Sequence, residues 1–183
     1  GRNGIASTGS LTITGGENGS LTAQGGSGAD GGHGGHGIYS NGSVTISGGS
    51  TVTANGGNGG SLVGGDGIRS GGGLTVSDGT VTAKGGNGDS KDGYGGDGIH
   101  SNDIDLSGSL ELTAKAGKGT QSNGKALSQN GRELDLNAIK DKLGPGAKVT
   151  ATDADGKVID QVSIPRPVEP EGPVIPRGVF FLF

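Results

Sequence analysis

Three short apolar patterns recur in a constant order along the first two thirds of the chain. The first pattern is Gly-Ile-x-Ser, and its apolar residue returns at intervals of 28 to 33 residues. These anchoring residues are Ile5, Ile38, Ile68, Ile99 and Leu127. An interval in this range is typical of repeat architectures in which each repeat stacks on the next one.

The other two patterns are triplets in which one polar residue separates two apolar residues. The second pattern occupies 11–13, 44–46, 74–76, 104–106 and 134–136. The third pattern occupies 21–23, 52–54, 81–83, 112–114 and 149–151. Alternation with a period of two and many β-branched residues predict short strands with one buried face.

The patterns together predict an all-β fold, a right-handed parallel β-solenoid (β-helix) of about four to five coils. One coil carries too few apolar side chains to be stable alone, so each column must be buried by stacking. We expect the anchoring residues of the first pattern to form a core ladder. The right-handed sense is the usual one for parallel crossovers.

Four glycine-rich segments connect the third strand of one coil to the first strand of the next. They span 25–36, 56–66, 85–97 and 116–124. Two interpretations remain open: protruding flexible loops, or extended, polyproline-II-like segments that pack closely because glycine has no side chain. The Asn-Gly pairs, including Asn130-Gly131, are interpreted as corners between strands, because the columns repeat in one direction.

The pattern changes after residue 136. Asn137 is expected to cap a short helix from Ala138 to Leu143, and 148–152 with 157–162 should form a hairpin. We interpret this part as a polar cap on the last coil. The sequence thus divides into a solenoid (1–136), a cap (137–163) and a proline-rich arm (164–183). No such cap precedes Gly4, so the first coil is expected to expose bare sheet edges.

The arm ends in an apolar stretch that contains every phenylalanine of the chain. Its prolines exclude a helix or a central strand. We predict that the stretch adds to a neighbouring copy by β-augmentation, and that such head-to-tail contacts propagate into a homo-oligomer or polymer. The self-association residues are Val179, Phe180, Phe181, Leu182 and Phe183.

Composition and charge narrow the range of partners. Glycine accounts for 45 of 183 residues, cysteine is absent, and the net charge is −4. That sign disfavours nucleic acid, and no apolar run is long enough for a membrane-spanning helix. Only Arg2, Glu17 and Asp30 are charged before residue 66, which suits lateral packing against like molecules or contact with neutral polysaccharide. The chain begins without Met, which we interpret as processing and as compatible with secretion.

Few residues are candidates for chemistry. His33 and His36 lie in a glycine-rich stretch that cannot hold a catalytic triad, so we expect no enzyme. Asp66 and Asp97 occupy equivalent places before Gly-Ile, but His36 and Lys125 replace them in other coils and break a calcium column. The weak Ca²⁺ candidates are Asp89, Asp92 and Asp97, and no other cofactor is expected.

Threonines and tyrosines are the candidate ligand contacts on the surface. A threonine column should line the third sheet, either as the favoured outward residue of a strand or as an ice-binding array. The candidate contacts are Thr22, Thr53, Thr82, Thr113, Tyr39 and Tyr94.

The phrases Gly-Ile-Tyr-Ser-Asn-Gly-Ser-Val-Thr-Ile-Ser-Gly-Gly (37–49) and Thr-Val-Thr-Ala-Asn-Gly-Gly-Asn-Gly-Gly (51–60) carry a family resemblance. They resemble the glycine-rich repeats of bacterial, mostly Firmicute, cell-surface proteins, some of which are grouped with β-helical carbohydrate-binding domains. The resemblance implies secretion, a parallel β-helix and association with a cell surface or with sugars.

The expected function is that of an extracellular or cell-surface structural protein that self-associates into a fibre through its arm. The alternative is a carbohydrate-binding or adhesive module that uses Tyr39, Tyr94 and the polar loops.

Overall fold

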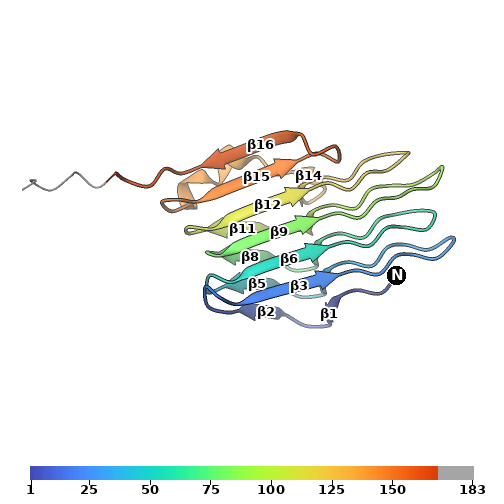
Figure 1. Cartoon of the computed structure of the whole chain (residues 1–183), viewed down its shortest axis with the longest axis horizontal. Helices are drawn as coiled ribbons and strands as arrows, with labels where there is room; N and C mark the ends of the chain where they lie inside the picture. Colours follow the sequence, from blue (N-terminus) through green and yellow to red (C-terminus); the bar gives the residue numbers. More distant parts are fainter. Residues whose placement is uncertain (169–183) are drawn as a thin grey trace, which may run out of the picture.

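The structure is a computed structural model that describes residues 1–168. Within that range the chain forms three sheets, whose strands stack from the bottom to the top of Figure 1. The predicted association residues, Val179 to Phe183, lie outside the described residues. No helix among the described residues is long and apolar enough to cross a membrane.

Each coil contributes one short strand to each sheet. The first sheet contains β1 (Ile5–Ser7), β4 (Ile38–Ser40), β7 (Ile68–Ser70), β10 (Ile99–Ser101), β13 (Leu127–Gln129) and β14 (Arg132–Glu133). The second contains β2 (Leu11–Thr14), β5 (Val44–Ser47), β8 (Leu74–Ser77) and β11 (Ile104–Ser107). The third contains β3 (Ser20–Gln24), β6 (Thr51–Asn55), β9 (Thr80–Lys84), β12 (Glu111–Lys115), β15 (Lys148–Thr152) and β16 (Val158–Ser163).

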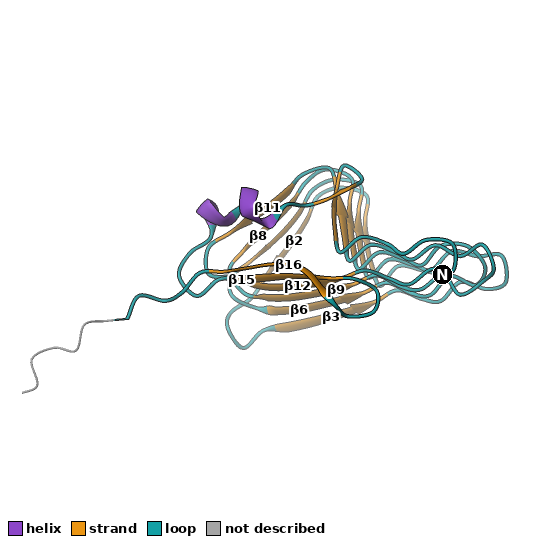
Figure 2. Cartoon of the chain, turned by 90° about the horizontal axis from the view of Figure 1, so that it is seen from above, coloured by secondary structure: helices purple, strands orange, loops and turns teal. Residues whose placement is uncertain are grey.

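The predicted architecture is confirmed: the molecule is an all-β parallel β-solenoid of about four turns. Seen from above, the chain passes through the first, second and third sheets in turn and rises toward the viewer in a right-handed sense (Figure 2). The predicted ladder is also confirmed, since Ile5 pairs with Ile38 and Ile99 with both Ile68 and Leu127. Within this ladder the residues from Ile38 to Leu127 are fully buried.

The glycine-rich segments project sideways from the body and lie next to one another (Figure 2). They are held by backbone hydrogen bonds both within a coil and between coils: Gly35 N donates to Gly26 O, and Gly57 N donates to Gly35 O, each at 2.8 Å. The same zigzag continues through Gly65, Gly86, Gly96, Gly117 and Gly124. The segments therefore protrude, as the first interpretation expected, but they form a packed, extended bundle, as the second expected. We call it the glycine bundle.

The cap differs from its prediction in detail. The hairpin is confirmed, since β15 and β16 pair antiparallel. The predicted helix is wrong: two 3₁₀ turns, η1 (Leu136–Ala138) and η2 (Lys140–Lys142), replace it, and the capping side chain is Asp135 rather than Asn137. Short 3₁₀ turns suit a segment in which only single apolar residues face the core.

The fifth triplet of the second pattern does not form a strand. Asn130 and Gly131 both have positive φ and reverse the chain, so that β14 pairs antiparallel with β13. The interpretation of this Asn-Gly pair as a corner is therefore wrong, because here it makes a hairpin turn. Leu134 and Leu136 are still buried and cover the top of the core.

Candidate functional site

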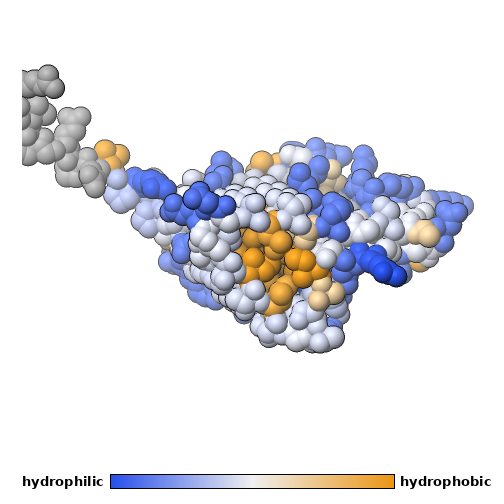
Figure 3. Space-filling model, turned by 60° about the horizontal axis from the view of Figure 1, so that its bottom comes forward, coloured by the Kyte–Doolittle hydropathy of each residue, from blue (hydrophilic) through white to orange (hydrophobic). Residues whose placement is uncertain are grey.

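The first coil leaves one end of the solenoid uncovered by the described residues. Strands β1, β2 and β3 are the terminal strands of their sheets, so each has one edge without a partner strand among residues 1–168. The larger apolar side chains on the strands of this coil are only partly buried, whereas their partners on the strands of the next coil are at most 1% exposed. We call this surface the open end-face; its residues are Ile5, Leu11, Ile13 and Leu21. Figure 3 shows apolar residues gathered on this side of the molecule, framed by more polar ones.

The opposite end is closed by polar side chains and by the cap. The carboxylate of Glu133 accepts the N–H groups of Ala126 and Leu127 at 2.9 and 2.6 Å. The side chain of Gln129 accepts the N–H of Ile104 at 2.8 Å. The β15–β16 hairpin continues the third sheet. The two ends of the solenoid are therefore chemically different, one apolar and open, the other polar and capped.

A ladder of acceptor side chains runs up the molecule beside the first sheet. Each member accepts the backbone N–H of the residue at the equivalent place in the next coil. Asn3 Oδ1 accepts from His36, His36 Nδ1 from Asp66, Asp66 Oδ1 from Asp97, and Asp97 Oδ1 from Lys125, at 2.7 to 2.9 Å. We call this series the acceptor ladder.

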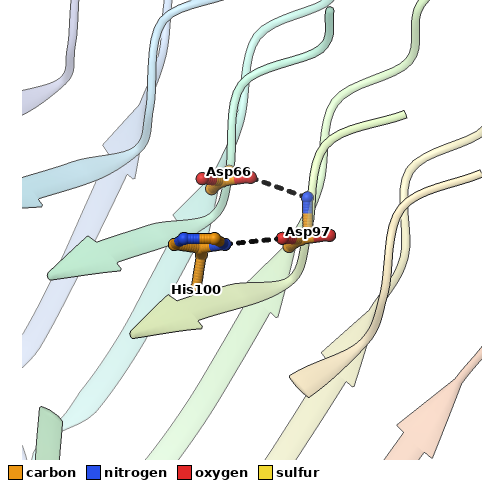
Figure 4. Close-up of side chains that lie close together, drawn as sticks. All are labelled: Asp66, Asp97 and His100. Atoms are coloured by element: carbon orange, nitrogen blue, oxygen red, sulfur yellow. Dashed lines mark hydrogen bonds and ion pairs between the residues drawn. The ribbon is translucent and has the colours of Figure 1, made fainter. Parts of the chain in front are cut away.

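Asp66, Asp97 and His100 lie at the middle of this ladder (Figure 4). Their candidate ligand atoms lie within 4.8 Å of one another. Each carboxylate oxygen, however, already has a partner: Asp66 Oδ2 accepts from Arg69 at 3.1 Å, and Asp97 Oδ2 contacts His100 Nδ1 at 2.9 Å. The guanidinium of Arg69 also opposes binding of a cation at this place. We therefore interpret Asp66, Asp97 and His100 as a structural part of the acceptor ladder.

Burial changes the acid–base properties of two ladder residues. It lowers the pKa of His36 to about 4, and the charges of Arg69 and His100 act in the same direction. It raises the pKa of Asp66, with the Asp97 carboxylate adding to the effect, while hydrogen bonds from Asp97 N–H and Arg69 oppose it. A neutral His36 is consistent with Nδ1 acting as an acceptor.

The residues predicted to bind calcium are not brought together. Asp89 and Asp92 are exposed in the glycine-rich segment of the third coil. Among residues 1–168, the structure groups Asp97 with Asp66 and His100 rather than with these two. The sequence did contain the signal for the ladder, but His36 interrupted the row of carboxylates. The shared property was an acceptor atom, which histidine and asparagine also provide.

The threonine column is in register on the outer face of the third sheet. Thr22 pairs with Thr53, Thr53 with Thr82, and Thr82 with Thr113. The two tyrosines belong to different parts of the molecule. Tyr39 lies on β4 and stacks on His36, with ring centroids 5.6 Å apart, whereas Tyr94 is 44% exposed in the glycine bundle.

Comparison with known proteins gives no relative. No protein-family model, no curated protein and no solved structure matches the chain. The class of protein is therefore defined by the fold alone, as a parallel β-solenoid with one open end and one capped end.

Proposed function

We propose that the protein is a structural, self-associating solenoid that assembles head to tail, outside the cell or on its surface. The observation that carries the proposal is the open end-face, which joins unpaired strand edges to a patch of half-buried apolar side chains. Edges of this kind are templates for another strand, and apolar surface that remains in water favours association. Because the arm leaves the chain at the opposite end, its contact with the end-face of another copy is heterologous and propagates rather than closing into a symmetric dimer.

The arm is the proposed occupant of the open end-face. The described chain leaves the capped end beyond β16, away from the first coil (Figure 1). The arm then has 20 residues from 164 onward, ending in Val-Phe-Phe-Leu-Phe. An extended segment of this length spans up to about 60 Å, enough to reach a neighbouring copy. Its apolar end matches the chemistry of the end-face, and its backbone can pair with β1, β2 or β3.

The test compares four chains by sedimentation velocity over a range of concentrations and by negative-stain electron microscopy. The parent chain should form filaments, whereas deletion of 174–183 and the variant Ile13→Glu should both give monomers. Val158→Glu places the same charge on the capped end, where Val158 is 49% exposed, and should assemble like the parent. Circular dichroism confirms that each variant is folded. Filaments from either the deletion or Ile13→Glu would overturn the proposal.

An extracellular location is supported by the sparsely charged surface of the first two coils and by the resemblance to cell-surface repeats. It is tested by adding protease to intact cells that produce the protein: an extracellular chain is degraded, and an internal chain survives. The alternative function is a carbohydrate-binding or adhesive module. The two tyrosines do not support it, because they lie on different elements. The surface that supports it is a groove beside the third sheet, described below.

A further inference from the structure

A polar groove of about 290 Å³ runs along the solenoid where the third sheet meets the glycine bundle. One wall is the column formed by the last residues of the strands in this sheet: Gln24, Asn55, Lys84 and Lys115. The other wall contains Asn58, Asn87 and Lys118, and glycines such as Gly56 and Gly85 lie between the walls. The groove is thus a straight channel with a repeat of about 4.8 Å, the spacing of neighbouring strands.

The amide side chains of the outer wall are held in one orientation. Asn58 Oδ1 accepts the N–H of Asn87, and Asn87 Oδ1 accepts the N–H of Lys118, both at 2.9 Å. These bonds use the acceptor half of each amide. The Nδ2 donors make no hydrogen bond to any residue of the described chain. The outer wall therefore presents a row of available donors.

The inner wall carries the positive charges of two lysines, whereas Lys118 of the outer wall contacts Asp155 at 3.5 Å. Lys84 and Lys115 are directly paired on adjacent strands, and neither forms an ion pair within residues 1–168. Like charges directly opposite each other destabilise a sheet. A ligand with negative charges along its length would remove this repulsion and gain charge-assisted hydrogen bonds. The whole chain has a net charge of −4, so the pair of lysines in the groove is a local excess of positive charge.

The backbone of the groove floor cannot pair with a peptide strand. Gly56 N donates to Lys84 O, and Gly85 N donates to Lys115 O, at 2.8 and 2.9 Å. The peptide groups between coils are thus already hydrogen-bonded, so a ligand must be recognised by side-chain donors. This excludes β-augmentation here and favours a polymer rich in oxygen acceptors.

We propose that this groove binds a linear anionic polysaccharide, with its carboxylates on Lys84 and Lys115 and its hydroxyl oxygens on the Nδ2 groups of Asn58 and Asn87. The polymer lies parallel to the solenoid axis and follows the repeat of the coils. The site is independent of self-association, because it uses neither the open end-face nor the arm.

The first test removes the donors without disturbing the fold. In Asn58→Asp/Asn87→Asp, each side chain keeps the oxygen that accepts the backbone N–H but replaces the donor with a negative oxygen. The matched control, Asn18→Asp/Asn137→Asp, makes the same change in charge at exposed positions away from the groove. Binding of polygalacturonate is measured by isothermal titration calorimetry, with the deletion of 174–183 in every chain so that assembly does not interfere.

The second test removes the charges. Lys84→Gln/Lys115→Gln is compared with Lys91→Gln/Lys140→Gln, which loses two exposed lysines outside the groove. Loss of two charge-assisted contacts should weaken binding by about tenfold or more, whereas the control should change it by less than about twofold. The groove variant should melt no lower than its parent, since it relieves repulsion.

The ligand class is tested with two further polymers. Dextran, which is neutral, should bind much more weakly than polygalacturonate, and so should single-stranded DNA. Equal affinity for DNA would indicate a general polyanion effect and would overturn the proposal. Equal losses in groove and control variants, or full binding by Asn58→Asp/Asn87→Asp, would also overturn it. None of these results depends on whether the full chain forms filaments.

Discussion

At the scale of single residues, glycine acts in this protein mainly as a packing residue. Most positive-φ glycines lie at turns outside the glycine bundle, with Gly31 at the tip of one segment. Inside the bundle the constraint is the missing side chain: a Cβ on Gly65 would lie 1.9 Å from Gly35 O. The conformational entropy that glycine loses on folding is offset by the backbone hydrogen bonds that this close approach permits.

Substitution of one bundle glycine should therefore be costly. We expect Gly65→Ala to destabilise the protein by about 3 kcal/mol, since the methyl group would force apart two hydrogen-bonded segments. Gly16→Ala is the matched control, because nothing lies within 4 Å of the added Cβ and the backbone is not left-handed. Urea denaturation followed by circular dichroism measures both. Equal effects would show that the bundle is not closely packed.

The acceptor ladder should make stability depend on pH through His36. Its pKa is depressed to about 4 in the folded state, from 6.5. The unfolded chain therefore binds more protons between these values, so this group stabilises the fold above pH 6.5 and the contribution is lost as pH falls toward 4. After allowance for solvent screening, we expect a loss of about 1–2 kcal/mol.

The variant His36→Asn isolates this contribution. Asparagine occupies the equivalent place in the first coil, where Asn3 makes the same contact. Denaturation of the two chains at several pH values should show a parent curve that is steeper between pH 6.5 and 4. Parallel curves would rule out a neutral His36 as the origin of the effect.

At the scale of elements, each strand is stabilised mainly by the strands above and below it. The short strands cannot bury their side chains within one coil, so burial depends on position in the stack. Ile46 has a neighbour on both sides, Ile13 and Val76, and is 1% exposed. Among residues 1–168, Ile13 has a strand neighbour on one side only. The same residue type in the same register thus experiences two environments.

The difference between Ile46 and Ile13 allows the contribution of stacking to stability to be measured. Ile46→Ala should cost about 3 kcal/mol, in the usual range for a buried aliphatic side chain, and Ile13→Ala about half of that. The comparison is made in the chain without 174–183, so that an occupied end-face does not mask it. Equal costs would mean that the first coil is covered by other parts of the chain.

At the scale of the whole molecule, the important property is that the two ends of the stack of coils differ. One end has open strand edges and apolar side chains, and the other carries a hairpin, two 3₁₀ turns and hydrogen-bonded caps. The head-to-tail assembly that we propose would stabilise the folded state by mass action. The groove runs along the side of the molecule, so a filament could present it repeatedly.

Thermal stability should therefore rise with protein concentration. The melting temperature of the parent chain is expected to increase by several degrees over a hundredfold range of concentration. The chain without 174–183 should melt at one temperature throughout. Differential scanning calorimetry measures both, and a parent chain with no dependence on concentration would speak against assembly through the arm.

The repeated patterns by themselves determined the solenoid class, the approximate number of coils, the parallel register and the core ladder. They could do so because a strand places alternate side chains on opposite faces, and because columns such as Ile38, Ile68 and Ile99 are buried only if the coils stack. The hairpin of the cap could also be predicted from the sequence, because the residues that favour its turn are the adjacent ones from Asp153 to Gly156.

Only the tertiary structure decided how the glycine-rich segments pack, what the acceptor ladder does, and how the cap covers the last coil. In each case the deciding contacts involve backbone groups of residues that are apart in the sequence, such as Gly35 with Gly26 and Gly57 in the glycine bundle, or Asp66 with Asp97 in the acceptor ladder. A carbonyl or N–H group leaves no trace in residue type. Asn130-Gly131 illustrates the limit: the same dipeptide makes a corner or a hairpin, according to whether a further coil remains to be stacked. The groove beside the third sheet arises in the same way, from two columns that only the fold of the glycine bundle brings face to face.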